Sequence, residues 1–120
     1  MANEITVTAM LGCVSGAINE VDADAVFTID QSVSSGSYPG FCTIATTEES
    51  ETFSEITTLG WCKIKNLDAT NFVDFGFTTA VYGIRLKPNE MAVFRLVPGV
   101  TMFMKADTSA VKVQIRCYDN

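Results

Sequence analysis

Two short acidic stretches hold the side chains with the most obvious capacity for chemistry. One is the run Glu-Glu-Ser-Glu at residues 48–51, and the other is the pair Asp22 and Asp24. A glycoside hydrolase needs one carboxyl group in an apolar pocket and a second at a set distance, whereas both stretches here are polar and turn-like. Asp22 also matches the start of a calcium loop, but Val33 stands at the twelfth position, where such a loop needs a glutamate. We therefore expect both stretches to lie on a solvated surface.

The chain contains no histidine, which removes the commonest general base and the commonest zinc ligand. A cysteine or serine nucleophile would lack its usual base, and no serine stands in a Gly-x-Ser-x-Gly turn. Gly12 and Gly16 do not form a phosphate-binding loop. The sequence thus predicts a protein that is not an enzyme and that has no catalytic, metal or cofactor site.

The charges are divided unevenly along the 120 residues, which carry 8 basic and 14 acidic side chains and a net charge of −6. No basic residue precedes Lys63, so the first 62 residues contain nine acidic groups, and the remainder holds eight basic groups beside five acidic ones. A nucleic-acid partner is not expected, because phosphate binding needs clustered Lys and Arg. Halves of opposite charge suit subunits that pack side by side, unless the strand order interleaves the halves and cancels the asymmetry.

The four cysteines, Cys13, Cys42, Cys62 and Cys117, include no Cys-x-x-Cys pair, which argues against a zinc site. Three of them, Cys42, Cys62 and Cys117, alternate with apolar neighbours and are predicted to be buried free thiols. The even number of cysteines also allows a disulfide.

The start of the chain is unlike a signal peptide, and no apolar run is long enough for a membrane span. We therefore expect no membrane partner and synthesis in the cytoplasm, where thiols stay reduced.

Alternation of apolar and polar residues predicts strands along most of the chain. Turn residues interrupt these strands at short intervals, for example at Pro88-Asn89 and Pro98-Gly99. We expect an all-β fold with under about 10% helix, an antiparallel β-sandwich of jelly-roll-like connectivity. One domain would span residues 1–120, and the first ten residues could act as an arm. The clearest alternating stretches are 5–9, 25–29, 72–77, 82–87, 91–96 and 110–118.

A series of motifs runs through residues 46–118. Gly-Trp-x-x-x-Lys-Asn-Leu-Asp-x-Thr-Asn-Phe-Val occupies residues 60–73, and Leu-Lys-Pro-Asn-Glu-Met-Ala follows at 86–92. A Pro-Gly turn at 98–99 and Lys-Ala-Asp-Thr-Ser-Ala-Val at 105–111 complete the series. In this order the motifs resemble small β-sandwich virion proteins of tailed bacteriophages, a group that includes head decoration (cement) proteins and neck or tail proteins. Asn89 departs from the pattern, because glycine is common there, but asparagine also tolerates left-handed turns.

The resemblance implies a non-enzymatic structural component of a tailed-phage virion. The function it favours is a capsid decoration protein that forms a homodimer or homotrimer and binds the major capsid protein. It also implies location in the virion after synthesis in the bacterial host cytoplasm. A neck or tail protein with neck or tail partners is the alternative within the same class.

The candidate interface residues are Trp61, Met91, Val93 and Arg95. Trp61 shares a strand face with two lysines, and Met91, Val93 and Arg95 lie on the face of their strand opposite Phe94. Exposed aromatic side chains among polar ones are typical of interface anchors, although a position at the edge of the core would also suit Trp61.

A carbohydrate-binding module is the alternative function of another class. It would use Tyr38, in an expected loop at 34–40, and the polar residues 66–71. Those polar residues are short side chains that close turns by bonds to nearby backbone amides, so a purely structural role is the simpler expectation for them.

Overall fold

The structure is a computed structural model that describes residues 4–23, 27–29 and 36–119. These residues form strands, turns and bends, and no helix. With no helix among them, none is present in this part of the chain that could cross a lipid bilayer. The chain divides into two compact units, residues 1–32 and residues 33–120.

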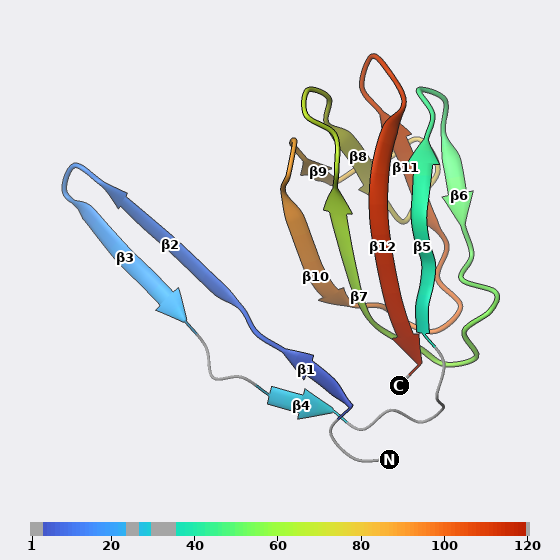
Figure 1. The fold of residues 1–120 in the computed structure, drawn as a ribbon, viewed down its shortest axis with the longest axis horizontal. Helices are drawn as coiled ribbons and strands as arrows, with labels where there is room; N and C mark the ends of the chain where they lie inside the picture. Colours follow the sequence, from blue (N-terminus) through green and yellow to red (C-terminus); the bar gives the residue numbers. More distant parts are fainter. Residues whose placement is uncertain (1–3, 24–26, 30–35, 120) are drawn as a thin grey trace. The chain divides into compact units, whose positions relative to one another are not determined.

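The first unit consists of two pairs of antiparallel strands (Figure 1). In one pair, β1 (Ile5–Val7) lies beside β4 (Phe27–Ile29). In the other pair, β2 (Met10–Ser15) and β3 (Ile18–Ala23) form a hairpin. The hairpin turns at Gly16, whose φ of 58° lies in the left-handed region that glycine adopts without steric cost. The strand expected at 25–29 is present from residue 27, and residues 24–26 lie outside the described residues.

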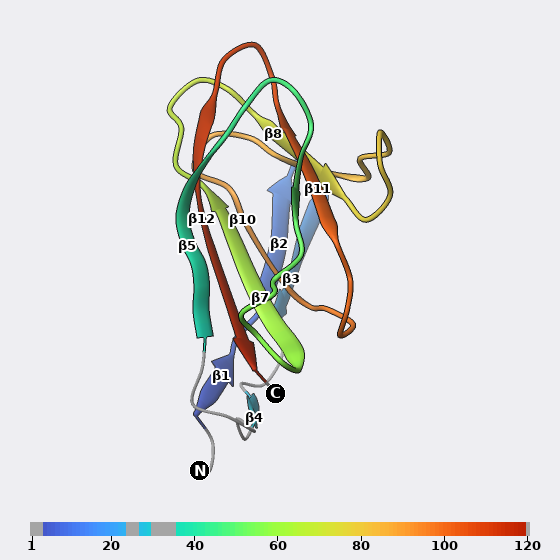
Figure 2. The same cartoon turned by 90° about the vertical axis from the view of Figure 1, so that its right-hand side faces the viewer.

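The second unit is two four-stranded antiparallel sheets that pack face to face, as Figures 1 and 2 show. The first sheet has the order β10-β7-β12-β5 and the second the order β6-β11-β8-β9. The prediction of an antiparallel β-sandwich is therefore confirmed. The strands are β5 (Gly36–Ile44), β6 (Glu49–Glu51), β7 (Leu59–Asn66), β8 (Val73–Gly76), β9 (Ile84–Leu86), β10 (Met91–Arg95), β11 (Met102–Ala106) and β12 (Val111–Asp119).

The pairing of these eight strands is nested. The first strand, β5, pairs with the last, β12, and the second, β6, pairs with the seventh, β11. The third, β7, pairs with the sixth, β10, and the two middle strands, β8 and β9, pair with each other. The eight strands thus have the connectivity of one long hairpin that is folded into two layers. Further pairings of β12 with β7 and of β11 with β8 complete the two sheets.

The core lies between the two sheets and follows the alternation in the sequence. Every second residue of β12, beginning with Val111, is buried, and Val113 and Ile115 are completely inaccessible. Ile64 of β7 and Phe75 of β8 contribute further fully buried side chains. Burying a side chain of this size stabilises the fold by about 1.5–3 kcal/mol, so this layer supplies most of the driving force.

The loop expected at 34–40 is corrected by the structure from residue 36 onward, because residues 36–40 belong to β5, and residues 34–35 lie outside the described residues. Pro39 lies within this strand, opposite Arg116 of β12. A proline is tolerated there because β5 is the edge strand of its sheet. No strand pairs with the free side of β5, so the N–H group that proline lacks has no partner there to lose.

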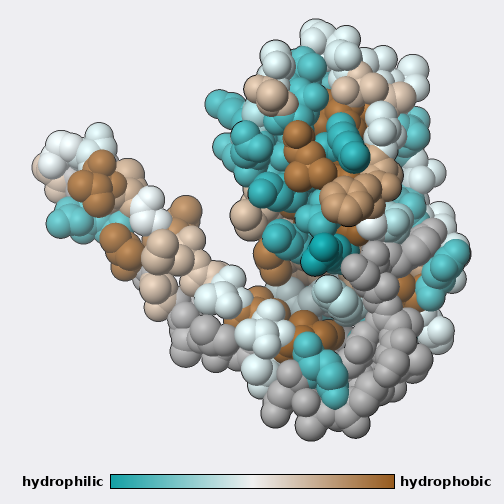
Figure 3. Space-filling model, in the orientation of Figure 1, coloured by the Kyte–Doolittle hydropathy of each residue, from teal (hydrophilic) through white to brown (hydrophobic). Residues whose placement is uncertain are grey.

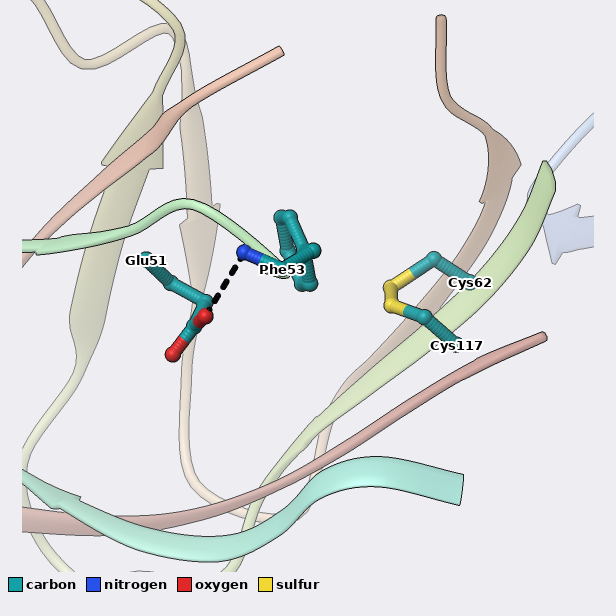
Figure 4. The surroundings of a disulfide bond; sticks show 4 residues. All are labelled: Glu51, Phe53, Cys62 and Cys117. Atoms are coloured by element: carbon teal, nitrogen blue, oxygen red, sulfur yellow. Dashed lines mark hydrogen bonds between the residues drawn. A yellow bond between two sulfur atoms is a disulfide. The ribbon is translucent and has the colours of Figure 1, made fainter. Parts of the chain in front are cut away.

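The prediction of free thiols at Cys62 and Cys117 is wrong, because the two residues form a disulfide (Figure 4). They stand directly opposite each other on β7 and β12, with their Cα atoms 4.1 Å apart. Their predicted burial is confirmed, since each is no more than 1% exposed. Cys42 is free and half-buried, and burial, together with Glu51 and Glu49, raises the pKa of its thiol to about 11.

Phe53 fills the core from a segment outside the strands (Figure 4). Its φ of 55° is unusual for a residue with a side chain, and its ring is 2% exposed. The Phe53 N–H donates to the Glu51 carboxylate at 2.8 Å, and the Phe53 carbonyl accepts from the Ile56 N–H at 3.0 Å. These two bonds and the burial of the ring offset the backbone strain.

Candidate functional site

The outer face of the β10-β7-β12-β5 sheet brings the four candidate interface residues together. Strand pairing places Arg95 opposite Trp61, while Met91 and Val93 lie opposite Lys65 and Lys63. The alternation along β7 and β10 turns these side chains away from the core, which holds Cys62, Ile64, Ala92 and Phe94 on the other side of the same strands. The four residues therefore form one continuous surface at the β7–β10 pair.

This outer face gathers five of the eight basic residues of the chain, namely Lys63, Lys65, Arg95, Lys112 and Arg116. The four strands contain one acidic residue, Asp119, which is 1% exposed and accepts the Thr58 N–H at 2.9 Å. Within the described strands, all the charged side chains on the outer face are therefore positive. We call these five residues, with Phe41, Trp61, Met91 and Val93, the basic face.

Two of the cations on the basic face are direct cross-strand neighbours. Arg116 of β12 lies opposite Lys63 of β7. Like charges in this arrangement destabilise a sheet, and a strand placed only to cover the core would not need them. The arrangement therefore suits a surface that binds a negatively charged partner.

Apolar and aromatic groups lie between these cations. Phe41 is 63% exposed and Met91 is 52% exposed. The Lys112 ammonium lies 5.6 Å from the centre of the Phe41 ring, and the Arg95 guanidinium lies 5.7 Å from the Trp61 ring. Figure 3 views the molecule from the side of this sheet and shows hydrophilic and hydrophobic side chains interspersed. Aromatic residues and arginine carry much of the energy in protein interfaces, so this composition favours a protein partner.

The acidic run at 48–51 is engaged in hydrogen bonds with neighbouring loops. Glu48 accepts hydrogen bonds from the Thr79 hydroxyl at 2.6 Å, from the Ala80 N–H at 2.6 Å and from the Tyr82 hydroxyl. Glu49 accepts the Ala45 N–H at 2.5 Å. The expectation of a simply solvated surface is thus incomplete, because these carboxylates hold loops in place.

We expect the Tyr82–Glu48 contact to be visible in an alkaline titration. The bond to the Glu48 carboxylate, with smaller contributions from burial and charge, raises the pKa of Tyr82 to about 12. In Glu48→Gln the phenol loses its charged acceptor, so its titration should move toward the ordinary value near 10. Absorbance at alkaline pH measures this shift, and Tyr82→Phe identifies the transition that belongs to Tyr82. An unchanged curve in Glu48→Gln would contradict the contact.

The same hydrogen bonds lower the pKa of Glu48 below 4.5. A depressed carboxyl pKa stabilises the fold above the pKa of the unfolded chain, and this contribution is lost as the pH falls through the folded value. The hydrogen bonds that Glu48 accepts from residues 79–82 therefore contribute less to stability in acid than at neutral pH.

The polar residues at 66–71 form a turn, as the sequence predicts. Asn66 is fully buried, and its amide donates to the carbonyls of Asn71 and Leu86 at 2.9 and 3.0 Å. Its side-chain oxygen accepts the Asp68 N–H at 2.8 Å. The Asp68 carboxylate accepts the N–H groups of Asn71 and Thr70, and these bonds lower the pKa of Asp68. These groups are engaged in hydrogen bonds within the turn.

An apolar hollow of about 350 Å³ lies between β9 and β10, and sequence reasoning did not find it. Ile84 and Phe94 line it together with Phe77 and Val97 of the adjoining loops. Phe94 stacks on Phe75 at 5.8 Å and meets the edge of Phe77 at 6.4 Å. The hollow has no titratable lining group apart from Arg95, so it offers shape and apolar contact and no catalytic group.

Metal binding finds no support in the described part of the chain, which contains no group of three or more His, Cys, Asp or Glu side chains placed to hold an ion. The basic face is therefore the strongest candidate for a functional site. No protein-family model, curated protein or solved structure matches this chain.

Proposed function

We propose that the protein is a non-enzymatic structural component of a tailed-phage virion, a capsid decoration protein that assembles as a homodimer or homotrimer and binds the major capsid protein. The observation that carries this proposal is the basic face, a cationic and apolar sheet surface with Trp61 and Arg95 at its edge. The phage assignment comes from the motif series within residues 46–118, which resembles such proteins. The basic face supplies the assembly surface that the assignment needs.

The nested strand pairing supports jelly-roll connectivity for the sandwich. In a jelly roll a long hairpin folds so that the first strand pairs with the last and the middle strands pair with each other, and the pairing of β5 with β12 and of β8 with β9 has this form. Viral capsid domains and lectins both use this architecture. Fold alone does not decide between them, and the internal engagement of Asn66 and Asp68 argues against the lectin.

The disulfide between Cys62 and Cys117 also suits a virion protein. Disulfides persist at the surface of virions and in other oxidising surroundings, whereas reducing cytoplasm opens them. A chain made in the host cytoplasm would form this bond after the virion leaves the cell. The two facing cysteines would then strengthen the particle at the stage when it must survive outside.

Quantitative mass spectrometry of purified virions tests the proposal. A decoration protein repeats over the capsid lattice, so several hundred copies per particle are expected, whereas a symmetric neck or tail ring would hold roughly six or twelve. The higher number supports decoration, and the lower one moves the protein to the neck or tail. Absence from the particle would overturn the proposal.

The role of the basic face in assembly can be tested separately on particles that lack the protein. We expect Lys63→Glu/Arg116→Glu to lose binding to such particles, because it reverses two neighbouring charges at the centre of the face. The matched control is Lys87→Glu, which reverses an exposed charge in the turn before β10. Equal loss in both variants would show a nonspecific charge effect and contradict a role for the face.

A further inference from the structure

The β2–β3 hairpin exposes its apolar side chains. All six residues of β2 are exposed, and the exposed fraction reaches 81% at Leu11, 74% at Val14 and 62% at Val21. A two-stranded hairpin is marginally stable in water by itself. Contiguous exposed apolar groups of this kind mark a surface that binds another protein.

The register of the hairpin gives it two different faces. Met10 and Val14 of β2 share one face with Val21 and Asn19 of β3, so this face is mostly apolar. Leu11 and Cys13 share the other face with Glu20, which lies directly opposite Cys13. The face that holds Glu20 therefore combines an exposed apolar side chain, Leu11, with negative charge.

The charge of the first unit is complementary to that of the basic face. Residues 1–32 contain five acidic residues and no lysine or arginine. The basic face has five cations, and the acidic residue within its four strands is buried. Both surfaces also expose apolar groups: Leu11 lies on the same hairpin face as Glu20, and Met91 and Val93 lie on the sheet. Complementary charge and apolar contact together are what a specific interface requires.

We propose that the β2–β3 hairpin of a second copy of this chain covers the basic face. This inference rests on the proposed function only in taking the basic face as an assembly surface, and it names the partner at that surface. A contact between one hairpin and one sheet is small beside the area that a stable interface buries. Reciprocal exchange between two copies, or a closed ring of three, repeats the contact by symmetry and multiplies the buried area. The occupant is a second copy because both complementary surfaces belong to the same chain.

The chain contains a natural fluorescence donor and a natural site for attaching an acceptor dye, so energy transfer can test the contact. Trp61 is the single tryptophan and lies on the basic face. Cys13 is exposed on the hairpin. Cys62 and Cys117 are bonded to each other, and the raised pKa of Cys42 slows its reaction with a maleimide at neutral pH. A fluorescent acceptor can therefore be attached selectively at Cys13.

Energy transfer between two differently marked copies distinguishes contact between chains from contact within one chain. The acceptor copy is Trp61→Phe labelled at Cys13, and the donor copy is unlabelled Cys13→Ser, which keeps Trp61. In a mixture, quenching of Trp61 fluorescence can arise only between copies. We expect quenching that grows with the concentration of the acceptor copy.

Charge variants test the chemistry of the contact. Glu20→Lys in the acceptor copy, or Lys63→Glu/Arg116→Glu in the donor copy, should raise the concentration needed for half-maximal quenching by roughly tenfold. Combining the two variants should restore part of the loss, and Lys87→Glu in the donor copy should leave the transfer unchanged.

Two results would overturn the inference. In the first, the mixture shows no quenching of Trp61, but the labelled wild-type chain at low concentration does. This result would mean that the hairpin contacts the sheet of its own chain. The other is the absence of quenching in both samples. Because the assay uses no virions, either failure leaves the capsid assignment standing, and absence of the protein from virions leaves the contact between copies standing.

Discussion

Removing the Cys62–Cys117 disulfide is expected to lower the free energy of unfolding by about 4 kcal/mol. The bond joins residues 55 positions apart, so it restricts a long loop of the unfolded chain. We expect Cys62→Ala/Cys117→Ala to unfold at a markedly lower denaturant concentration than the oxidised protein. For a domain of this size the melting temperature should fall by roughly 20 °C. Chemical denaturation with and without reductant measures the same difference on the unaltered chain.

The control for this prediction is Cys42→Ala, which removes a half-buried free thiol from the neighbouring strand β5. Its effect should stay within about 1 kcal/mol, and reductant should still destabilise it. Thiol counting gives an independent readout. The unreduced chain, once unfolded, should show two reactive thiols, Cys13 and Cys42, and the reduced chain should show all four. Four thiols without reductant would contradict the disulfide.

Replacing Asn66 with alanine is expected to cost about 3 kcal/mol of unfolding free energy. The substitution leaves the carbonyls of Asn71 and Leu86 and the N–H of Asp68 without the partners that the buried amide supplies. An unsatisfied buried polar group costs about 1–3 kcal/mol, and water can reach only part of this network. Denaturant unfolding of Asn66→Ala measures the loss.

Asn89→Gly is the matched control for Asn66→Ala. The backbone N–H of Asn89 donates to the Asn66 carbonyl at 3.1 Å, and glycine keeps this bond. Glycine also suits the φ of 66° at this position. We expect a change within about 0.5 kcal/mol, because the substitution is on the surface and relieves strain in the turn. If Asn66→Ala were as mild as this control, the buried amide would not hold the turn as the hydrogen bonds indicate.

Parity along a strand explains why much of the sandwich could be predicted. Successive residues of a strand point to opposite faces, so the alternation at 110–118 already separates the buried Val113 from the exposed Arg116. The same argument placed Trp61, Met91, Val93 and Arg95 on outward faces. The turn at 66–71 was also predictable, because short polar side chains bond to nearby backbone amides.

The β2–β3 hairpin was not predicted, for a physical reason. A strand that buries one face carries a period of two in its sequence, but β2 is exposed along its whole length and has no such period. Gly12 further weakens the signal, because glycine is uncommon inside strands. The turn at Gly16 was the remaining local sign of a hairpin.

The sequence by itself determined the all-β class, the side of each strand that faces the core and the lack of a histidine-based catalytic set, because these depend on composition and on neighbours along the chain. The tertiary structure alone decided which strands lie together. It paired Cys62 with Cys117, placed the donors of residues 79–82 around Glu48 and collected cations from β7, β10 and β12 on one face. Parity gives the face of a residue but not its neighbour on another strand, and that neighbour is set by the packing of two sheets around a shared core.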